Sequence, residues 1–228
     1  MFLDFLNVIF NDPFPDFKIS TRASCYAQRC CSSVNDKDNP MKKTWVWTLL
    51  SVPALVICVR YFIDSISYGQ AIHQTGQWSV GILILTLAIT PLRKAFGPKP
   101  WLLGTLKHRR ALGVACFSYA SLHTLFYLER KWGADLIIKE GLEWPLATGW
   151  LALAIFLALA ITSNDVSVRK MKRGWKRLHR AVYAAALLTF VHWWLATFDP
   201  ANAYVFAAVL LAVQLLRLKK KRTPIPDS

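Results

Sequence analysis

Two histidines, His123 and His192, lie inside hydrophobic segments that are long enough to cross a membrane. An imidazole in hydrocarbon is costly, so an ionisable side chain at that depth is by default a candidate for a functional site. Two neutral imidazoles from two helices are also the axial ligands that a six-coordinate haem iron requires. The pair is therefore the first candidate for the chemistry of this chain, with haem b as the candidate cofactor.

The composition indicates a membrane protein. Of the 228 residues, 54% are hydrophobic, which exceeds the usual apolar share of a soluble domain. The formal net charge of +15 would suit nucleic-acid binding in a soluble protein. Here the lysines and arginines cluster between the apolar segments, with no basic amphipathic face and no RNA-binding motif, so we interpret them as a topology signal.

The predicted fold class is all-α, a polytopic membrane helix bundle with about six transmembrane helices. Each apolar segment approaches the ~20 residues that cross ~30 Å of hydrocarbon. Backbone groups in lipid must be hydrogen-bonded within helices or a closed barrel, so these segments are expected to be helical. The predicted spans are residues 44–63, 77–93, 110–128, 146–163, 180–198 and 202–218.

The distribution of positive charge predicts the orientation. Twenty lysines and arginines fall on one side of the membrane, in segments 42–43, 93–110, 164–180 and 217–222, and four fall on the other side. Cytoplasmic loops carry an excess of these residues. Both termini are therefore predicted to be cytoplasmic.

Residues 1–40 differ from the rest of the chain, because they carry proline breakers and mixed charges and contain no membrane-length run. They match neither a signal peptide nor a transit peptide, whereas Met41 opens a basic start that leads directly into the first span. We predict that 1–40 is a non-native or disordered extension, and that translation begins at Met41. An intact mass that includes these residues would contradict this. The transmembrane domain is predicted at 41–222, followed by a cytoplasmic tail at 223–228.

The two candidate ligands are predicted to lie at similar depth. His123 is thirteen residues into the third span and His192 is twelve residues into the fifth, and both spans run outward. Each imidazole is therefore ~20 Å along its helix axis, in the outer half of the membrane. The alternative is two separate histidines that stabilise helix packing, each hydrogen-bonded to a nearby backbone or hydroxyl group. The matched depth favours a shared haem.

His179 precedes His192 by thirteen residues and lies at the cytoplasmic end of the fifth span. On one ideal helix this offset is ~20 Å of rise and ~140° of rotation, so the two could not serve one haem. His179 could instead ligate a second, inner haem. It could also contact haem propionates or a flavin phosphate, and so could three neighbouring arginines. These arginines are Arg109, Arg110 and Arg180.

Two further histidines have weaker claims. His108, which precedes the third span, is the one histidine at the depth of a partner for an inner haem. It could equally be a solvated residue of a basic loop. His73 lies before the second span on the outer side, where it could be an interfacial cap or a third group near the outer cofactor.

Several segments carry a family resemblance. Segment 109–123, RRALGVACFSYASLH, and segment 175–183, WKRLHRAVY, which is followed by His192, closely resemble the MsrQ/YedZ family. Segments 72–76, IHQTG, and 87–92, LAITPL, also fit its pattern. That family is the haem-binding membrane subunit of the bacterial periplasmic methionine-sulfoxide reductase system, within the ferric-reductase-like transmembrane superfamily. The resemblance covers about residues 41–222.

The resemblance implies an electron-transfer function in the bacterial inner (cytoplasmic) membrane. Members pass electrons from the quinone pool, or from a cytosolic flavin reductase, through haem b. The acceptor is a periplasmic molybdopterin-containing reductase that repairs methionine sulfoxide in oxidised proteins. Members are also described as carrying FMN. The residues that match the haem-associated histidines are His123, His179 and His192, whereas His108 is outside the pattern.

The residues agree with a subunit rather than a whole reductase. The chain has no Rossmann glycine-rich fingerprint and no molybdenum- or substrate-binding domain, so the sulfoxide chemistry is expected in the partner. A single outer haem leaves much of the ~30 Å core uncrossed on the cytoplasmic side. A second haem at His179, a flavin or a diffusing quinol would have to fill that gap.

Two alternatives stay open. One keeps the haem in a ferric or quinol-linked cytochrome b with another acceptor, although a self-contained ferric reductase would need an FAD/NADPH module. The other is a haem-free transporter or membrane scaffold. Transporters often show matching broken helices in two halves. Pro53 interrupts the first predicted span, and no matching interruption is found in another half.

Overall fold

The structure, a computed structural model, describes residues 40–97, 99–131, 143–197 and 201–216. These residues form α-helices and no strands. The predicted extension at 1–40, apart from Pro40, and the predicted tail at 223–228 lie outside the described residues. The helices are α2 (Pro40–Phe62), α3 (Tyr68–Phe96), α4 (Pro100–Lys107), α5 (Arg109–Arg130), α7 (Trp144–Ile161), α8 (Asp165–Met171), α9 (Arg173–His179), α10 (Val182–Ala196) and α11 (Ala201–Leu215).

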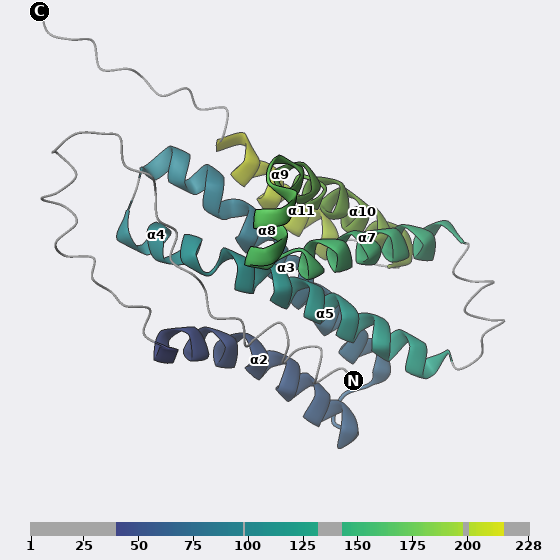
Figure 1. The fold of residues 1–228 in the computed structure, drawn as a ribbon. Coiled ribbons are helices and arrows are strands. Elements are labelled where there is room, and N and C mark those ends of the chain that lie inside the picture. Colours follow the sequence, from purple (N-terminus) through teal and green to yellow (C-terminus); the bar gives the residue numbers. More distant parts are fainter. Residues whose placement is uncertain (1–39, 98, 132–142, 198–200, 217–228) are drawn as a thin grey trace, which may run out of the picture.

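The architecture is that of a polytopic helical membrane protein, as the sequence predicted. Each predicted span overlaps one of the longer helices, and these lie alongside one another in Figure 1. In the described residues, α2, α3, α5 and α7 are long and apolar enough to cross a membrane, and α11 is a shorter apolar helix. Helix α10 has 15 residues. Helix α2 continues through Pro53, so the predicted interruption of this span is not seen.

Helix α3 begins nine residues before the predicted second span, at Tyr68 instead of 77. Ser67 caps it by accepting a hydrogen bond from the backbone N–H of Gln70, and the Gln70 side chain accepts one from the backbone N–H of Ser67. This reciprocal capping box satisfies amides that have no partner within the helix. His73 therefore lies inside α3, and the prediction that it precedes the second span is wrong.

Replacing Ser67 by alanine is expected to destabilise the start of α3, by about 1 kcal/mol, because the cap bond to the Gln70 amide is lost. The measurement is the thermal unfolding temperature of the purified protein in detergent. Thr105→Ala is a suitable control, because the Thr105 hydroxyl bonds only within its own exposed turn of α4. An equal effect of both substitutions would contradict this role of the cap.

Two helix pairs make up most of the bundle: α3 packs against α5, and α7 packs against α10. The largest cluster of buried apolar side chains joins all four helices. Within the first pair, the Ser79 hydroxyl donates to the carbonyl of Cys116 over 3.0 Å, so a polar side chain is satisfied across the packed interface. Cys116 is itself buried.

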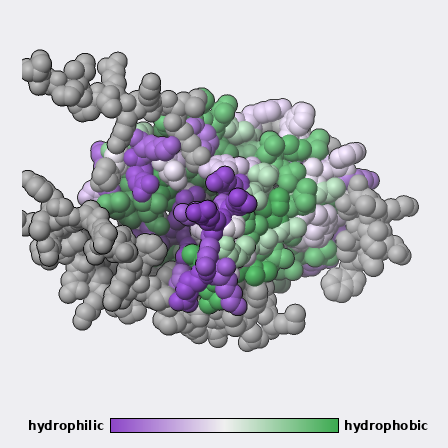
Figure 2. Space-filling model, turned by 45° about the horizontal axis from the view of Figure 1, so that its top comes forward, coloured by the Kyte–Doolittle hydropathy of each residue, from purple (hydrophilic) through white to green (hydrophobic). Residues whose placement is uncertain are grey.

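The short helices α4, α8 and α9 gather toward one end of the bundle in Figure 1, close to the start of α5. Many of the lysines and arginines of the described residues belong to these helices and their junctions. On the face that Figure 2 shows, hydrophilic side chains collect in one part and hydrophobic side chains cover most of the rest. This separation is the one expected for a bundle that has one strongly cationic end.

Candidate functional site

The bundle brings His123 of α5 and His192 of α10 together. Their ring centres are 6.2 Å apart and the ring planes are nearly perpendicular, at 89°. The two residues are 69 positions apart in the sequence and belong to different helix pairs. Their proximity is therefore a product of the fold.

Each of the two imidazoles is hydrogen-bonded through Nδ1 to a backbone carbonyl of its partner helix. His123 Nδ1 donates to Ile72 in α3 over 2.8 Å, and His192 Nδ1 donates to Pro145 in α7 over 2.7 Å. Because a carbonyl oxygen only accepts, the proton lies on Nδ1 and the lone pair of the neutral ring lies on Nε2. Metal-binding histidines are commonly oriented by a bond of this kind.

These bonds are what helix-packing histidines would also make, so the bonds alone do not separate the two interpretations. The spacing of the rings meets one requirement of haem ligation, although edge-to-face packing of two rings gives similar spacings. A coordinated imidazole nitrogen lies about 2 Å from a metal and its ring centre about 1 Å further, so two axial imidazoles have ring centres about 6 Å apart. The observed 6.2 Å fits that arrangement.

The kind of metal site follows from the number of side-chain ligands. No cluster of three or more His, Cys, Asp or Glu side chains suited to a metal ion occurs in the part of the chain that the structure describes. A pair of imidazoles fits haem, because the porphyrin itself provides the other ligands of the iron. The residues present are thus compatible with a haem held between α5 and α10.

A separate cavity of about 440 Å³ lies at the cationic end. It contains all four residues that the sequence singled out for an inner site, whereas His123, His192 and His108 do not line it. Its cationic and imidazole side chains are those of Lys107, Arg109, Arg110, Lys176, His179 and Arg180. Its apolar lining includes Leu83, Cys116, Phe156, Leu159 and Val182. An anionic group with a flat apolar body would suit this combination.

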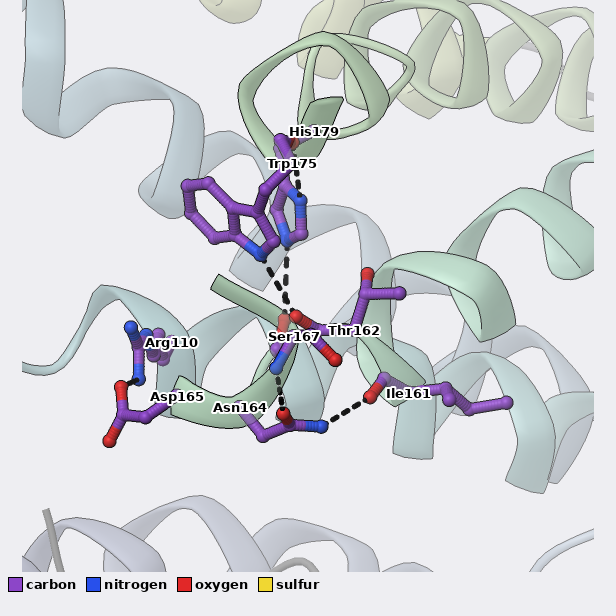
Figure 3. A network of polar contacts seen from close by, with 9 residues as sticks. Arg110, Ile161, Thr162, Asn164, Asp165, Ser167, Trp175 and His179 are labelled. Atoms are coloured by element: carbon purple, nitrogen blue, oxygen red, sulfur yellow. Dashed lines mark hydrogen bonds and ion pairs between the residues drawn. The ribbon is translucent and has the colours of Figure 1, made fainter. Parts of the chain in front are cut away.

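His179 is held in place by its own short helix and by the end of α7 (Figure 3). Its ring stacks on that of Trp175, with centres 3.9 Å apart, and its Nδ1 lies 3.2 Å from the Trp175 carbonyl oxygen. Its Nε2 lies 3.4 Å from the hydroxyl of Ser163. The indole of Trp175 in turn donates to the carbonyl of Thr162 over 2.9 Å.

The chain bends between His179 and His192. Helix α9 ends at His179 and α10 begins at Val182, so the two histidines are not on one continuous helix. The rotation that an ideal helix would give them therefore does not apply. They nevertheless occupy different sites, because His179 lines the cavity and His192 does not.

An ion pair fixes one of the cavity arginines. Arg110 at the start of α5 binds the carboxylate of Asp165 at the start of α8 (Figure 3). Asn164 caps α8 by accepting from the backbone N–H of Ser167 over 2.7 Å. Arg109 lies 3.5 Å from the hydroxyl of Thr90. The sequence reasoning missed Asp165, although Asn-Asp before an amphiphilic segment is a recognisable helix start.

Burial lowers the pKa of His179 below its ordinary 6.5, and the charges of Arg109 and Arg110 add to this, against the opposing effect of the Trp175 carbonyl. The unfolded chain then binds a proton that the folded chain does not. The free energy of unfolding should therefore fall as the pH drops below 6.5. We expect this in the thermal unfolding of the haem-free protein. His179→Gln should flatten the dependence, and an unchanged pH profile would contradict the prediction.

Neither of the other two histidines lines the cavity. His73 is exposed on α3, and its ring centre is 6.2 Å from that of Trp193, the neighbour of His192. It therefore lies near the outer pair. His108 stands at the junction of α4 and α5, where it ends one helix and precedes the next.

Comparison with known proteins agrees with this picture. The family described as "Ferric reductase like transmembrane component" matches residues 75–190. The chain is 38% identical over 152 residues to proteins from Brucella ovis, Brucella canis and Brucella suis, covering 65% of this chain and 67% of each relative. Each relative is named "Protein-methionine-sulfoxide reductase heme-binding subunit MsrQ". No solved structure matches significantly. The chain therefore belongs to the MsrQ/YedZ family, within the ferric-reductase-like transmembrane proteins.

Proposed function

We propose that this chain is a membrane electron-transfer subunit that binds haem b between His123 and His192. The observation that carries the proposal is the 6.2 Å separation of two imidazole rings that both bind a carbonyl through Nδ1. The name of the relatives, a heme-binding subunit, supports the same cofactor. A haem iron with two imidazole ligands exchanges single electrons.

The protein's own contribution is to hold and orient the ligands. The carbonyls of Ile72 and Pro145 keep both rings in the Nδ1–H form, so both Nε2 lone pairs would be available to bind the iron. Because the ligands come from different helix pairs, haem would join the α3–α5 pair to the α7–α10 pair.

We further propose that the cavity around His179 holds a second, anionic redox group that fills the inner half of the membrane. The candidates are FMN, whose phosphate would bind the cationic side chains, and a second haem with propionates and an imidazole ligand. The proposal is supported by the cavity volume of about 440 Å³ and by the presence of His179, Arg109, Arg110 and Arg180 in its lining. A quinol that reaches the outer haem by diffusion is the remaining route.

The proposed donors are the quinone pool or a cytosolic flavin reductase. The proposed acceptor is a periplasmic molybdopterin-containing methionine-sulfoxide reductase that repairs oxidised proteins. Sulfoxide reduction takes two electrons and haem passes one at a time, so the subunit must cycle twice for each product. The excess of basic residues on one side supports an inner-membrane orientation with both termini in the cytoplasm.

The dithionite-reduced absorption spectrum of the purified protein, with haem quantitation, tests the proposal. We expect the Soret and α bands of a reduced b-type haem. A protein without these bands would contradict haem binding and leave a transporter or scaffold. Co-purification with a periplasmic molybdoenzyme would separate sulfoxide repair from a cytochrome b that serves another acceptor.

A further inference from the structure

Two glycines leave the space that the two imidazoles occupy. A Cβ atom built on Gly149 of α7 would lie 2.8 Å from Nδ1 and 2.9 Å from Cε1 of His192. A Cβ atom on Gly76 of α3 would lie 3.2 Å from Nδ1 of His123. No other described glycine outside these two would place a Cβ near a histidine. Each ring therefore lies against the bare backbone of the neighbouring helix.

Each glycine has the same position in the sequence relative to the residue whose carbonyl accepts the hydrogen bond from the ring. Gly76 follows Ile72 by four residues, and Gly149 follows Pro145 by four residues. On an α-helix, positions i and i+4 lie one above the other on the same face. On each helix, the carbonyl that accepts the hydrogen bond and the glycine that leaves space for the ring therefore lie on the same face. We call this pair of residues a notch: Ile72 and Gly76 form it in α3, and Pro145 and Gly149 form it in α7.

This repetition connects the glycines with the two helix pairs. In the α3–α5 pair, the notch lies on α3 and the histidine on α5; in the α7–α10 pair, the notch lies on α7 and the histidine on α10. Glycine weakens a helix relative to alanine. A glycine at each notch therefore lowers the stability of the helix. The close approach of an imidazole ring explains why glycine is nevertheless present at each notch.

Resting on the haem site proposed above, we propose that Gly76 and Gly149 are positioning residues for the two axial imidazoles. Each glycine lets the ring approach until Nδ1–H reaches the carbonyl, and so fixes the ring plane and the tautomer. A methyl group at either position pushes the ring away from the helix and lengthens this bond. The imidazole then donates less electron density to the iron, which shifts the reduction potential of the haem upward.

The test compares Gly149→Ala and Gly76→Ala with Gly81→Ala. Gly81 is a matched control on α3, because a Cβ there meets nothing within 4 Å. The readouts are haem per chain, the electron paramagnetic resonance (EPR) spectrum of the ferric protein, and the midpoint potential. Loss of such an orienting bond weakens metal binding by about 10–100-fold. We expect the larger loss of haem affinity in Gly149→Ala, a smaller one in Gly76→Ala, and a wild-type result for Gly81→Ala.

A second arm keeps the inference testable if Gly149→Ala is unstable. In a His192→Ala background the ring is gone, so the same glycine substitution should raise the thermal stability of the protein, because alanine favours the helix. With His192 present it should lower it. Wild-type spectra and potentials in both glycine variants of a haem-loaded protein would overturn the inference alone. A wild-type protein that binds no haem would overturn the proposed function together with it.

Discussion

Replacing His192 by alanine is expected to lower the content of the haem bound between His123 and His192 to less than about a tenth of its wild-type value. Changes in residues that merely orient a ligand cost about 10–100-fold in metal affinity, so removal of the ligand itself should cost at least as much. His123→Ala should have the same effect, because the two rings lie on opposite sides of one proposed iron. The measurement is the ratio of haem to protein chain after purification.

His108→Ala is the matched control for these variants. His108 lies between α4 and α5. It is not one of the two paired histidines and does not line the cavity, so its replacement should leave the haem content unchanged. Added imidazole should restore part of the haem binding in His192→Gly, because the free ligand can enter the space of the missing side chain. Full haem content in both His123→Ala and His192→Ala would contradict the ligand assignment.

Removing two cavity arginines is expected to have the second large effect. In the double variant Arg109→Gln, Arg180→Gln, an anionic group in the cavity should bind at least about 100-fold more weakly. This follows because charge-assisted hydrogen bonds contribute about 1.5–3 kcal/mol each. The absorption spectrum of the outer haem should stay as in the wild type, while its reduction by the physiological donor becomes correspondingly slow. Arg110 is left in place because its ion pair with Asp165 also joins two helices.

Arg177→Gln is the control, since Arg177 is exposed on α9 and does not line the cavity. Flavin and haem analysis of the same samples identifies the inner group. If it is FMN, flavin content falls in the double variant and the haem content does not. If it is a second haem, His179→Ala loses one of two haems per chain. Equal reduction rates in the wild type, the double variant and Arg177→Gln would contradict an inner redox group held by these arginines.

Much of the architecture could be predicted because it depends on local features. Apolar length located the spans, and the clustering of basic residues located the cationic end. The break between α9 and α10 after His179 was not predicted. The end of α9 at His179 depends on how this short helix packs against the end of α7. The early start of α3 could have been recognised from Ser67 and Gln70, since a serine followed three residues later by glutamine marks a helix start.

The candidate site was only partly visible in the sequence. Histidine in an apolar segment is a strong signal, and counting residues from the membrane surface placed His123 and His192 at one depth. The groups that orient them were not visible, because a backbone carbonyl has no residue type. The two glycines could have been noticed, but their meaning depends on which helix packs against which, and that is a property of the folded bundle.

The most direct test of haem ligation is the EPR spectrum of the ferric protein, measured on the wild type, His123→Ala and His192→Ala at equal protein concentration. We expect a low-spin haem with two imidazole ligands in the wild type, and a high-spin haem or no haem in each variant. A high-spin wild-type haem, or the same low-spin spectrum in all three proteins, would contradict a haem held between His123 and His192.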